Sequence, residues 1–140
     1  MKATELMIDD WILVDGIPSQ VKGVDNNGQI TYSHPYTEVL FTTYDFEPLP
    51  ITSEILEKNG FEHYNEGERN CCEGYYYDKN YKNDKLENLL YGDGDTWGCI
   101  WGRRLYDEYI CYDINIHCVS ELQHLLRVLN VEELINNFKV

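Results

Sequence analysis

Cysteine and histidine side chains are the first candidates for chemistry in this sequence, because thiolates and imidazoles bind metals and act as nucleophiles or bases. Structural zinc sites usually contain two ligand pairs at C-x-x-C-like spacing, and no such pair occurs here. Five cysteines with one adjacent pair also make a poor disulfide framework. We therefore predict reduced, mostly buried thiols and no metal or cofactor, while a small Cys/His metal-binding protein remains an alternative. The candidate ligands are Cys71, Cys72, Cys99, Cys111, His117, Cys118 and His124.

The sequence does not contain a recognisable catalytic motif. Ser120 lies close in sequence to Cys118 and His124, but it is better explained as the start of a helix. Gly-x-Ser-x-Gly, His-Glu-x-x-His and phosphate-binding Gly-Lys-Ser/Thr patterns do not occur. Residues 78–84 resemble the start of a calcium loop, yet Lys82 and Leu89 occupy ligand positions. We predict that the protein is not an enzyme, and an enzyme of unknown reaction stays as an alternative.

Net charge is the strongest global signal. The 25 acidic and 11 basic residues give a formal net charge of −14, most of it in the N-terminal half. Because proteins bind nucleic acid mainly through Lys and Arg, direct nucleic-acid binding is disfavoured. A basic protein partner is favoured, although acidic surfaces also serve solubility alone. The candidate partner-binding acids are Asp9, Asp10, Asp15, Asp25, Glu38, Asp45 and Glu47.

Aromatic residues are concentrated in the second half of the chain. Eight tyrosines and two tryptophans lie between positions 75 and 112. Since neighbouring strand residues point to opposite faces, at least one of three consecutive tyrosines should face away from a core. Such rings either pack a β-rich core or anchor an interface. The candidate anchors are Trp11, Tyr75, Tyr76, Tyr77, Trp97 and Trp101.

Short strands and a few helices must position these residues. The Asp-Asn-Asn-Gly sequence at 25–28 predicts a hairpin turn, and Thr52 or Ser53 predicts the start of a helix that stops at Asn59-Gly60. Leucines at helical spacing after Ser120 predict a C-terminal helix. Strands in blocks with helices set apart indicate an α+β fold. We predict a small SH3-like β-barrel module at 1–50, followed by an α+β second half at 51–140, packed with it or continuous with it.

The sequence also bears on location. No apolar run approaches the roughly 20 residues that cross a bilayer. Residues 1–5 lack the basic start and apolar block of a signal peptide. We therefore expect a cytoplasmic protein with no membrane association.

Three segments carry a resemblance to a known family. They are residues 47–61, with Pro48-Leu49-Pro50 and Asn59-Gly60-Phe61; residues 3–6 with Asp10-Trp11-Ile12; and residues 119–125, with Leu122-Gln123-His124-Leu125. Together they resemble a family of small bacterial proteins that phages and mobile elements often carry. The match departs at Ile8-Asp9-Asp10, where the family pattern has a glycine before the Asn or Asp. No activity is established for the family as a whole, so the resemblance implies genomic context and no catalytic residues.

The negative net charge, the aromatic residues and the family resemblance together suggest a function. Small acidic proteins of mobile elements often block host defence systems by binding them. We expect a non-enzymatic interaction protein, encoded by a phage or mobile element, that inhibits a basic nucleic-acid-binding host protein in the anti-CRISPR or counter-defence manner. A homo-oligomeric structural module, assembled through the C-terminal helix, is the remaining alternative.

Overall fold

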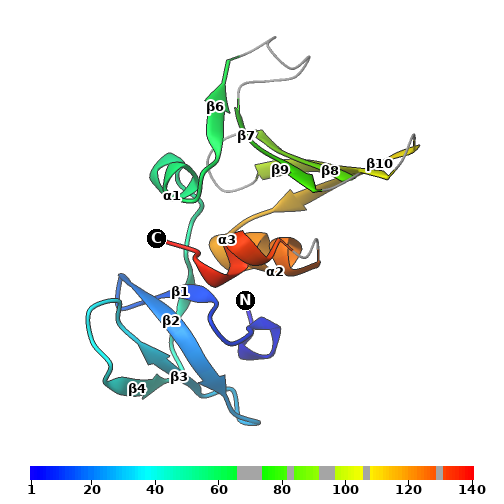
Figure 1. Cartoon of the computed structure of the whole chain (residues 1–140). Helices are drawn as coiled ribbons and strands as arrows, with labels where there is room; N and C mark the ends of the chain where they lie inside the picture. The colour runs from blue at the N-terminus through cyan, green and yellow to red at the C-terminus, as the bar shows by residue number, and fades with distance from the viewer. Residues whose placement is uncertain (66–73, 82–83, 92–96, 106–107, 129–130) are drawn as a thin grey trace. The chain divides into compact units, whose positions relative to one another are not determined.

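The computed structural model describes residues 1–65, 74–81, 84–91, 97–105, 108–128 and 131–140 (Figure 1). The chain forms two compact units. The first contains Met1–Ile51, Cys118–Phe138 and Val140, and the second contains Thr52–His117 and Lys139. The mixture of antiparallel sheets and helices makes the fold α+β, as the sequence predicts. The predicted domains at 1–50 and 51–140 stay a prediction.

An antiparallel sheet of five strands forms the centre of the first unit. Its order is β4-β3-β2-β1-β5, so β4 and β5 are its edges. These two strands are not paired with each other within residues 1–65, so closure into an SH3-like barrel stays a prediction. The strands are β1 (Trp11–Val14), β2 (Ile17–Val24), β3 (Ile30–Ser33), β4 (Leu40–Thr43) and β5 (Glu47–Pro48).

Two tight turns set the register of this sheet. Asp15 and Gly16 both adopt positive φ angles, 51° and 75°, and this pair joins β1 to β2 with Val14 opposite Ile17. Consecutive positive φ angles are the geometry that matches the twist of a hairpin. In the next turn the Asp25 carboxylate accepts hydrogen bonds from two backbone N–H groups, those of Asn27 and Gln29. The predicted hairpin turn at 25–28 is confirmed by the pairing of β2 with β3.

A core cluster of the first unit lies on one face of the sheet. Alternate residues of β1, Ile12 and Val14, are buried there, as the two-residue period of a strand requires. Tyr32 from β3 joins the same cluster, and Leu6 follows the short 3₁₀ helix η1 (Ala3–Glu5) into it. These residues bury the apolar surface that stabilises the sheet.

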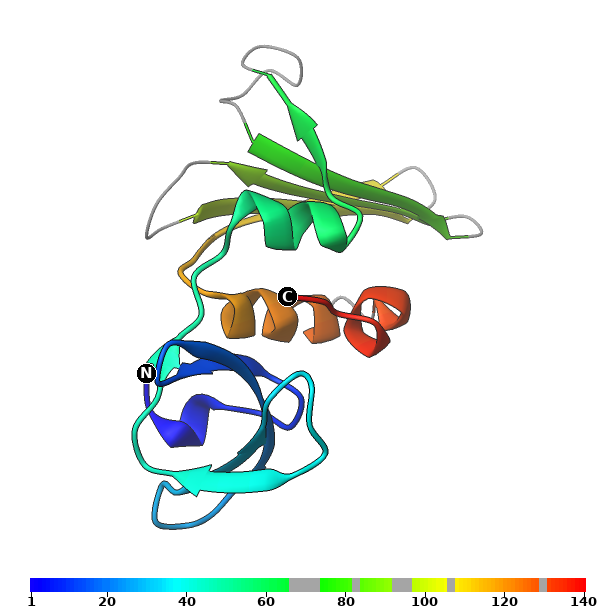
Figure 2. The same cartoon turned by 90° about the vertical axis from the view of Figure 1, so that its left-hand side faces the viewer.

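Helix α2 (Val119–Val128) contacts β1, and α3 (Glu132–Asn136) packs on α2 (Figure 2). Leu122, Leu125 and Leu126 are buried, which confirms the apolar face predicted from their spacing. The backbone N–H of Val119 donates to the carbonyl of Leu49 at 2.9 Å, so the first turn of α2 is fixed to the segment after β5. None of the described helices combines the length and apolar character needed to span a bilayer.

The second unit contains its own antiparallel sheet, with order β10-β9-β8-β7-β6. Helix α1 (Ser53–Lys58) begins at Thr52, whose hydroxyl accepts a hydrogen bond from Ile55 N as an N-cap. The helix stops at Asn59-Gly60, as predicted, with Gly60 at φ 83°. The strands are β6 (Glu62–Tyr64), β7 (Gly74–Tyr81), β8 (Asp84–Tyr91), β9 (Trp97–Leu105) and β10 (Glu108–Ile116).

Asn59 ties the C-terminal part of the second unit to α1. Its side-chain amide donates to the carbonyls of Ile55 and Lys139, both at 2.7 Å. Its side-chain oxygen accepts from Lys139 N at 2.9 Å. Asn59 is buried, so these bonds satisfy polar groups of its side chain that solvent does not reach.

We expect Asn59→Ala to lower the free energy of unfolding by about 2 kcal/mol, because the carbonyl of Ile55, which is in a buried hydrogen bond, and the partly buried backbone of Lys139 lose their partner. Urea denaturation followed by circular dichroism measures this loss. The exposed neighbour Ser53 provides the control, since Ser53→Ala should change stability by less than about 0.5 kcal/mol. Equal effects of the two substitutions would contradict the bridging role of Asn59.

Candidate functional site: the β4 edge

Strand β4 exposes large apolar side chains. Leu40 is 57% exposed and Phe41 41% exposed. Val39, just before the strand, and Tyr36 and Tyr44, on either side of it, are also exposed. We call these five residues the β4 patch. Because single exposed apolar residues are ordinary but clusters of them mark interaction sites, the β4 patch is the leading candidate site.

Aromatic contacts with the core hold part of the patch in place. Phe41 lies opposite Tyr32 in the β3–β4 register, and their ring centroids are 5.7 Å apart. The His34 ring is 5.4 Å from both rings. Tyr32 is buried in the core of the first unit. Phe41 is therefore positioned by a fixed ring on one side while its other side remains open to solvent.

Among the described strands, the main chain of β4 is paired on one side only, because β4 is an edge strand whose one neighbour there is β3. In an antiparallel strand, alternate residues direct their N–H and C=O groups away from that neighbour. Proteins usually protect such an edge with Lys, Pro or a bulge. The Leu-Phe-Thr-Thr sequence of β4 contains no charge and no proline, and its pairing with β3 is regular.

Two carboxylates lie at the ends of the edge. Glu38 precedes β4 by two residues and Asp45 follows it by two. Both are exposed, and neither forms an ion pair with the residues that the structure describes. No Lys or Arg occurs from residue 23 to residue 57. Strand β4 therefore exposes apolar side chains and has a carboxylate without an ion-pair partner among the described residues near each of its ends.

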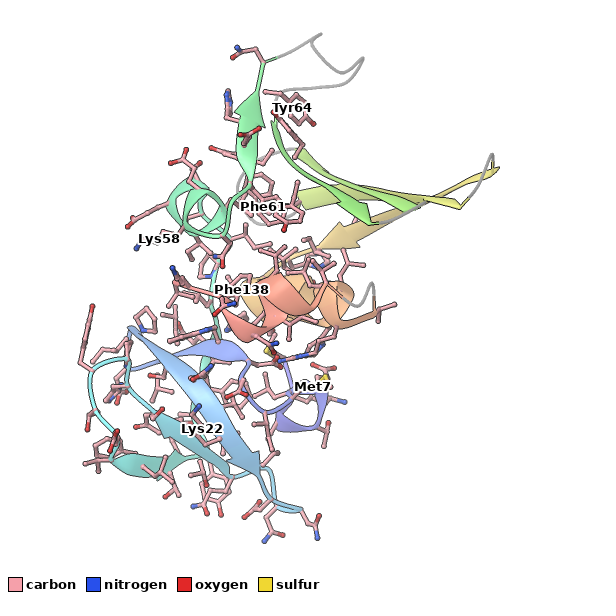
Figure 3. All side chains as sticks on the ribbon, in the orientation of Figure 1. Met7, Lys22, Lys58, Phe61, Tyr64 and Phe138 are labelled. Atoms are coloured by element: carbon pink, nitrogen blue, oxygen red, sulfur yellow. The ribbon has the colours of Figure 1, made fainter. Side chains whose placement is uncertain are left out.

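The other predicted surface acids are dispersed over the first unit. Asp9 forms an ion pair with Lys22 at 2.9 Å (Figure 3 labels Lys22). Asp25 caps its own turn, and Asp15 occupies the β1–β2 hairpin turn. Glu47 lies on β5, the opposite edge of the sheet from β4. Of the seven predicted acids, the structure thus brings Glu38 and Asp45 to the apolar patch.

Asp10 is not a surface acid. Its side chain is fully buried, where Arg127 Nη1 donates to its carboxylate at 2.6 Å. His124 Nε2 lies 2.7 Å from the other carboxylate oxygen, which also accepts from Met7 N at 2.8 Å. Figure 3 labels Met7 in this loop. A buried charge needs such partners to offset its lost hydration. Asp10 therefore has a structural role and is not part of the predicted binding surface.

Gln123 extends this network to the start of β1. Trp11 N donates to its side-chain oxygen at 2.9 Å, and its amide nitrogen donates to Asp9 O at 3.0 Å. Trp11 itself is buried, and its indole N–H has no hydrogen-bond partner among the described residues. A buried ring cannot contact a partner without rearrangement, so Trp11 is a core residue and not an exposed anchor.

The predicted aromatic anchors of the second unit that the structure describes lie in packing contacts or a hydrogen bond. Tyr75 and Trp97 are buried, with ring centroids 6.2 Å apart, so neither is an exposed anchor. Tyr76 is half-buried and donates a hydrogen bond to Glu62. Tyr77 is half-buried and its ring centroid is 5.5 Å from that of Phe61, which Figure 3 labels. The remaining predicted anchor is Trp101, whose side chain lies outside the described part of the structure.

The metal and nucleophile candidates are only partly described. Among the residues whose placement is described, no three His, Cys, Asp or Glu side chains gather to hold a metal ion. Cys118 is buried, with its sulfur 3.3 Å from the Ser120 hydroxyl. Cys71 and Cys72 lie outside the described residues, and Cys99 and Cys111 are described for their backbone alone.

Comparisons with protein-family models, curated proteins and solved structures find no significant match to this chain. The family resemblance of the three sequence segments therefore stays a prediction.

Sequence reasoning did not identify the β4 patch. Val39-Leu40-Phe41 reads as a strand of three consecutive apolar residues, and an apolar run of this kind usually indicates a strand buried on both faces. The signal that could have revealed exposure is the polar neighbourhood, since acids and turn residues flank the run on both sides. Edge position itself follows from sheet order, which the local sequence does not contain.

We expect Asp10→Asn to lower the stability of the first unit by about 3 kcal/mol, because Arg127 then loses its buried counter-ion. Amide hydrogen exchange of β1, measured by NMR, reports this unit specifically. Asp15→Asn is the control, because it removes an equal charge from an exposed turn where asparagine also tolerates positive φ. It should change the free energy of opening that β1 exchange reports by less than about 0.5 kcal/mol. Unchanged β1 protection in Asp10→Asn would contradict the assigned role.

Proposed function

We propose that this protein is a non-enzymatic, acidic interaction protein whose β4 edge binds a basic nucleic-acid-binding protein. The observation that carries the proposal is the β4 patch, with Glu38 and Asp45 at the two ends of strand β4. Binding would occupy the groove that the partner otherwise uses for RNA or DNA. Inhibition of this kind corresponds to the anti-CRISPR or counter-defence function.

Apolar and acidic groups contribute differently in this proposal. Exposed tyrosine and phenylalanine side chains supply buried area and affinity when a partner covers them. The carboxylates steer the encounter and select a basic surface. Their effect is strong here because no Lys or Arg lies within residues 23–57 to neutralise them. The same lack of cations argues against a nucleic-acid ligand for this surface.

Two finer assignments belong to the same proposal. We assign the first unit to the SH3-like class, which five short antiparallel strands joined by tight turns support. We also place the protein in the cytoplasm of a bacterium that carries a phage or mobile element, on the basis of its sequence resemblance and reduced-cysteine pattern. These assignments make a bacterial nucleic-acid-binding factor the expected target class.

The decisive experiment is a pull-down from bacterial lysate at low salt, with bound proteins identified by mass spectrometry. We expect the wild-type protein to recover a basic nucleic-acid-binding protein. The double variant Glu38→Gln/Asp45→Asn should recover about tenfold less, because steering and charge pairing at the patch are lost. Raising the salt from about 50 mM to about 500 mM should reduce recovery similarly, since exposed charges are screened.

A matched variant controls for net charge. Glu54→Gln/Glu57→Gln also removes two exposed acids, but from α1 in the second unit. The Lys58 ammonium hydrogen-bonds and attracts the Glu54 carboxylate, which lowers the pKa of Glu54. We expect this variant to retain wild-type recovery. Equal losses in both double variants would show that net charge acts without a specific site, and loss in neither would refute the proposed site.

A further inference from the structure

We propose that the β4 edge binds its partner by strand addition, with an extended segment of basic character pairing along the free side of β4. This inference rests on the proposed function and specifies how that surface is used. The occupant is a partner segment with β-branched or aromatic residues in its middle and Lys or Arg at its ends.

The exposed side chains of β4 favour an added strand over a partner that docks on one face. Successive strand residues point to opposite faces of a sheet, and the neighbours Leu40 and Phe41 are both exposed. Both faces of the sheet are therefore open at this edge. A partner surface laid on one face would cover only one of these side chains. A strand added to the edge places its own residues beside both.

The backbone of β4 supplies the matching polar groups. Its unpaired N–H and C=O groups form a ready template for another strand, as in other peptide recognition by strand addition. Such main-chain bonds do not depend on the sequence of the occupant. The flanking acids Glu38 and Asp45 then provide the selectivity, because they favour basic residues at the two ends of an added strand.

Charge complementarity also argues against a second copy of this chain as the occupant. Antiparallel self-pairing about the centre of β4 places Leu40 opposite Thr43, and two residues further out it places Glu38 opposite Asp45. Like charges directly opposite each other destabilise a strand pair. A symmetric dimer would contain two such repulsive pairs, whereas a basic segment would convert each carboxylate into an attractive contact.

The distance between the acids defines the length of the occupant. Glu38 and Asp45 are seven positions apart in the sequence. At about 3.3 Å per residue, an extended partner needs about eight residues to reach both. We therefore expect a basic residue near each end of a segment of this length.

The test uses a synthetic peptide of about ten residues, with alternating valine and threonine between two lysines at each end. Two derivatives carry N-methyl groups on alternate residues, one on the odd positions and one on the even positions. All three peptides have the same charge. Binding to the full-length protein is measured by fluorescence anisotropy at low salt.

Strand addition predicts saturable binding of the unmodified peptide. One N-methylated derivative should bind about tenfold or more weakly, and the other should bind like the parent, because alternate N–H groups face the neighbouring strand. Equal binding of all three peptides would overturn strand addition and leave the proposed function standing. Absence of binding by all three would also overturn it, while the lysate pull-down decides the proposed function independently.

Proline variants of β4 provide a second, protein-side measurement. Of the adjacent positions Phe41 and Thr42, one directs its N–H to β3 and the other directs it away. Proline is tolerated at an edge position whose N–H faces outward. We expect one of Phe41→Pro and Thr42→Pro to keep the wild-type circular dichroism spectrum and to bind the unmodified peptide about tenfold more weakly. Wild-type affinity in that folded variant would overturn the proposal.

Discussion

The buried carboxylate of Asp10 is the interaction on which the first unit depends. It receives hydrogen bonds from Arg127 and from the backbone of Met7, and His124 lies against its second oxygen. These contacts join the loop before β1 to α2, across 114 and 117 residues of sequence. A buried carboxylate without its cations would be strongly destabilising. The first unit therefore needs segments from both ends of the chain in order to fold.

This network also determines where negative charge remains on the surface. The first unit contains only three Lys or Arg residues, Lys2, Lys22 and Arg127. Lys22 pairs with Asp9 and Arg127 pairs with Asp10. Two of its three cations are thus paired with acids of one loop, the loop before β1. The acids beside β4 remain without partners among the described residues, so their field is available to a basic protein.

Local signals in the sequence predict the turns and helix ends of this fold but not the site. The turn at 25–28 and the cap at Thr52 follow from side chains that bond to their own neighbourhood. The burial of Asp10 and Trp97 depends on residues far away in the sequence or in other strands, which composition does not reveal. The exposure of Phe41 depends on β4 being the last strand, a property of sheet order alone.

The β4 edge has to meet two requirements that usually conflict: openness to a partner strand and resistance to self-association. An uncharged edge strand that exposes apolar side chains invites association with other exposed strands. Glu38 and Asp45 oppose the most abundant competitor, another copy of the same chain, since self-pairing brings them opposite each other. The same carboxylates attract a strand that carries basic residues at its ends. In the proposed binding mode, one arrangement of charge would therefore provide both protection against self-association and selectivity for a basic partner, as specificity by combined attraction and repulsion requires.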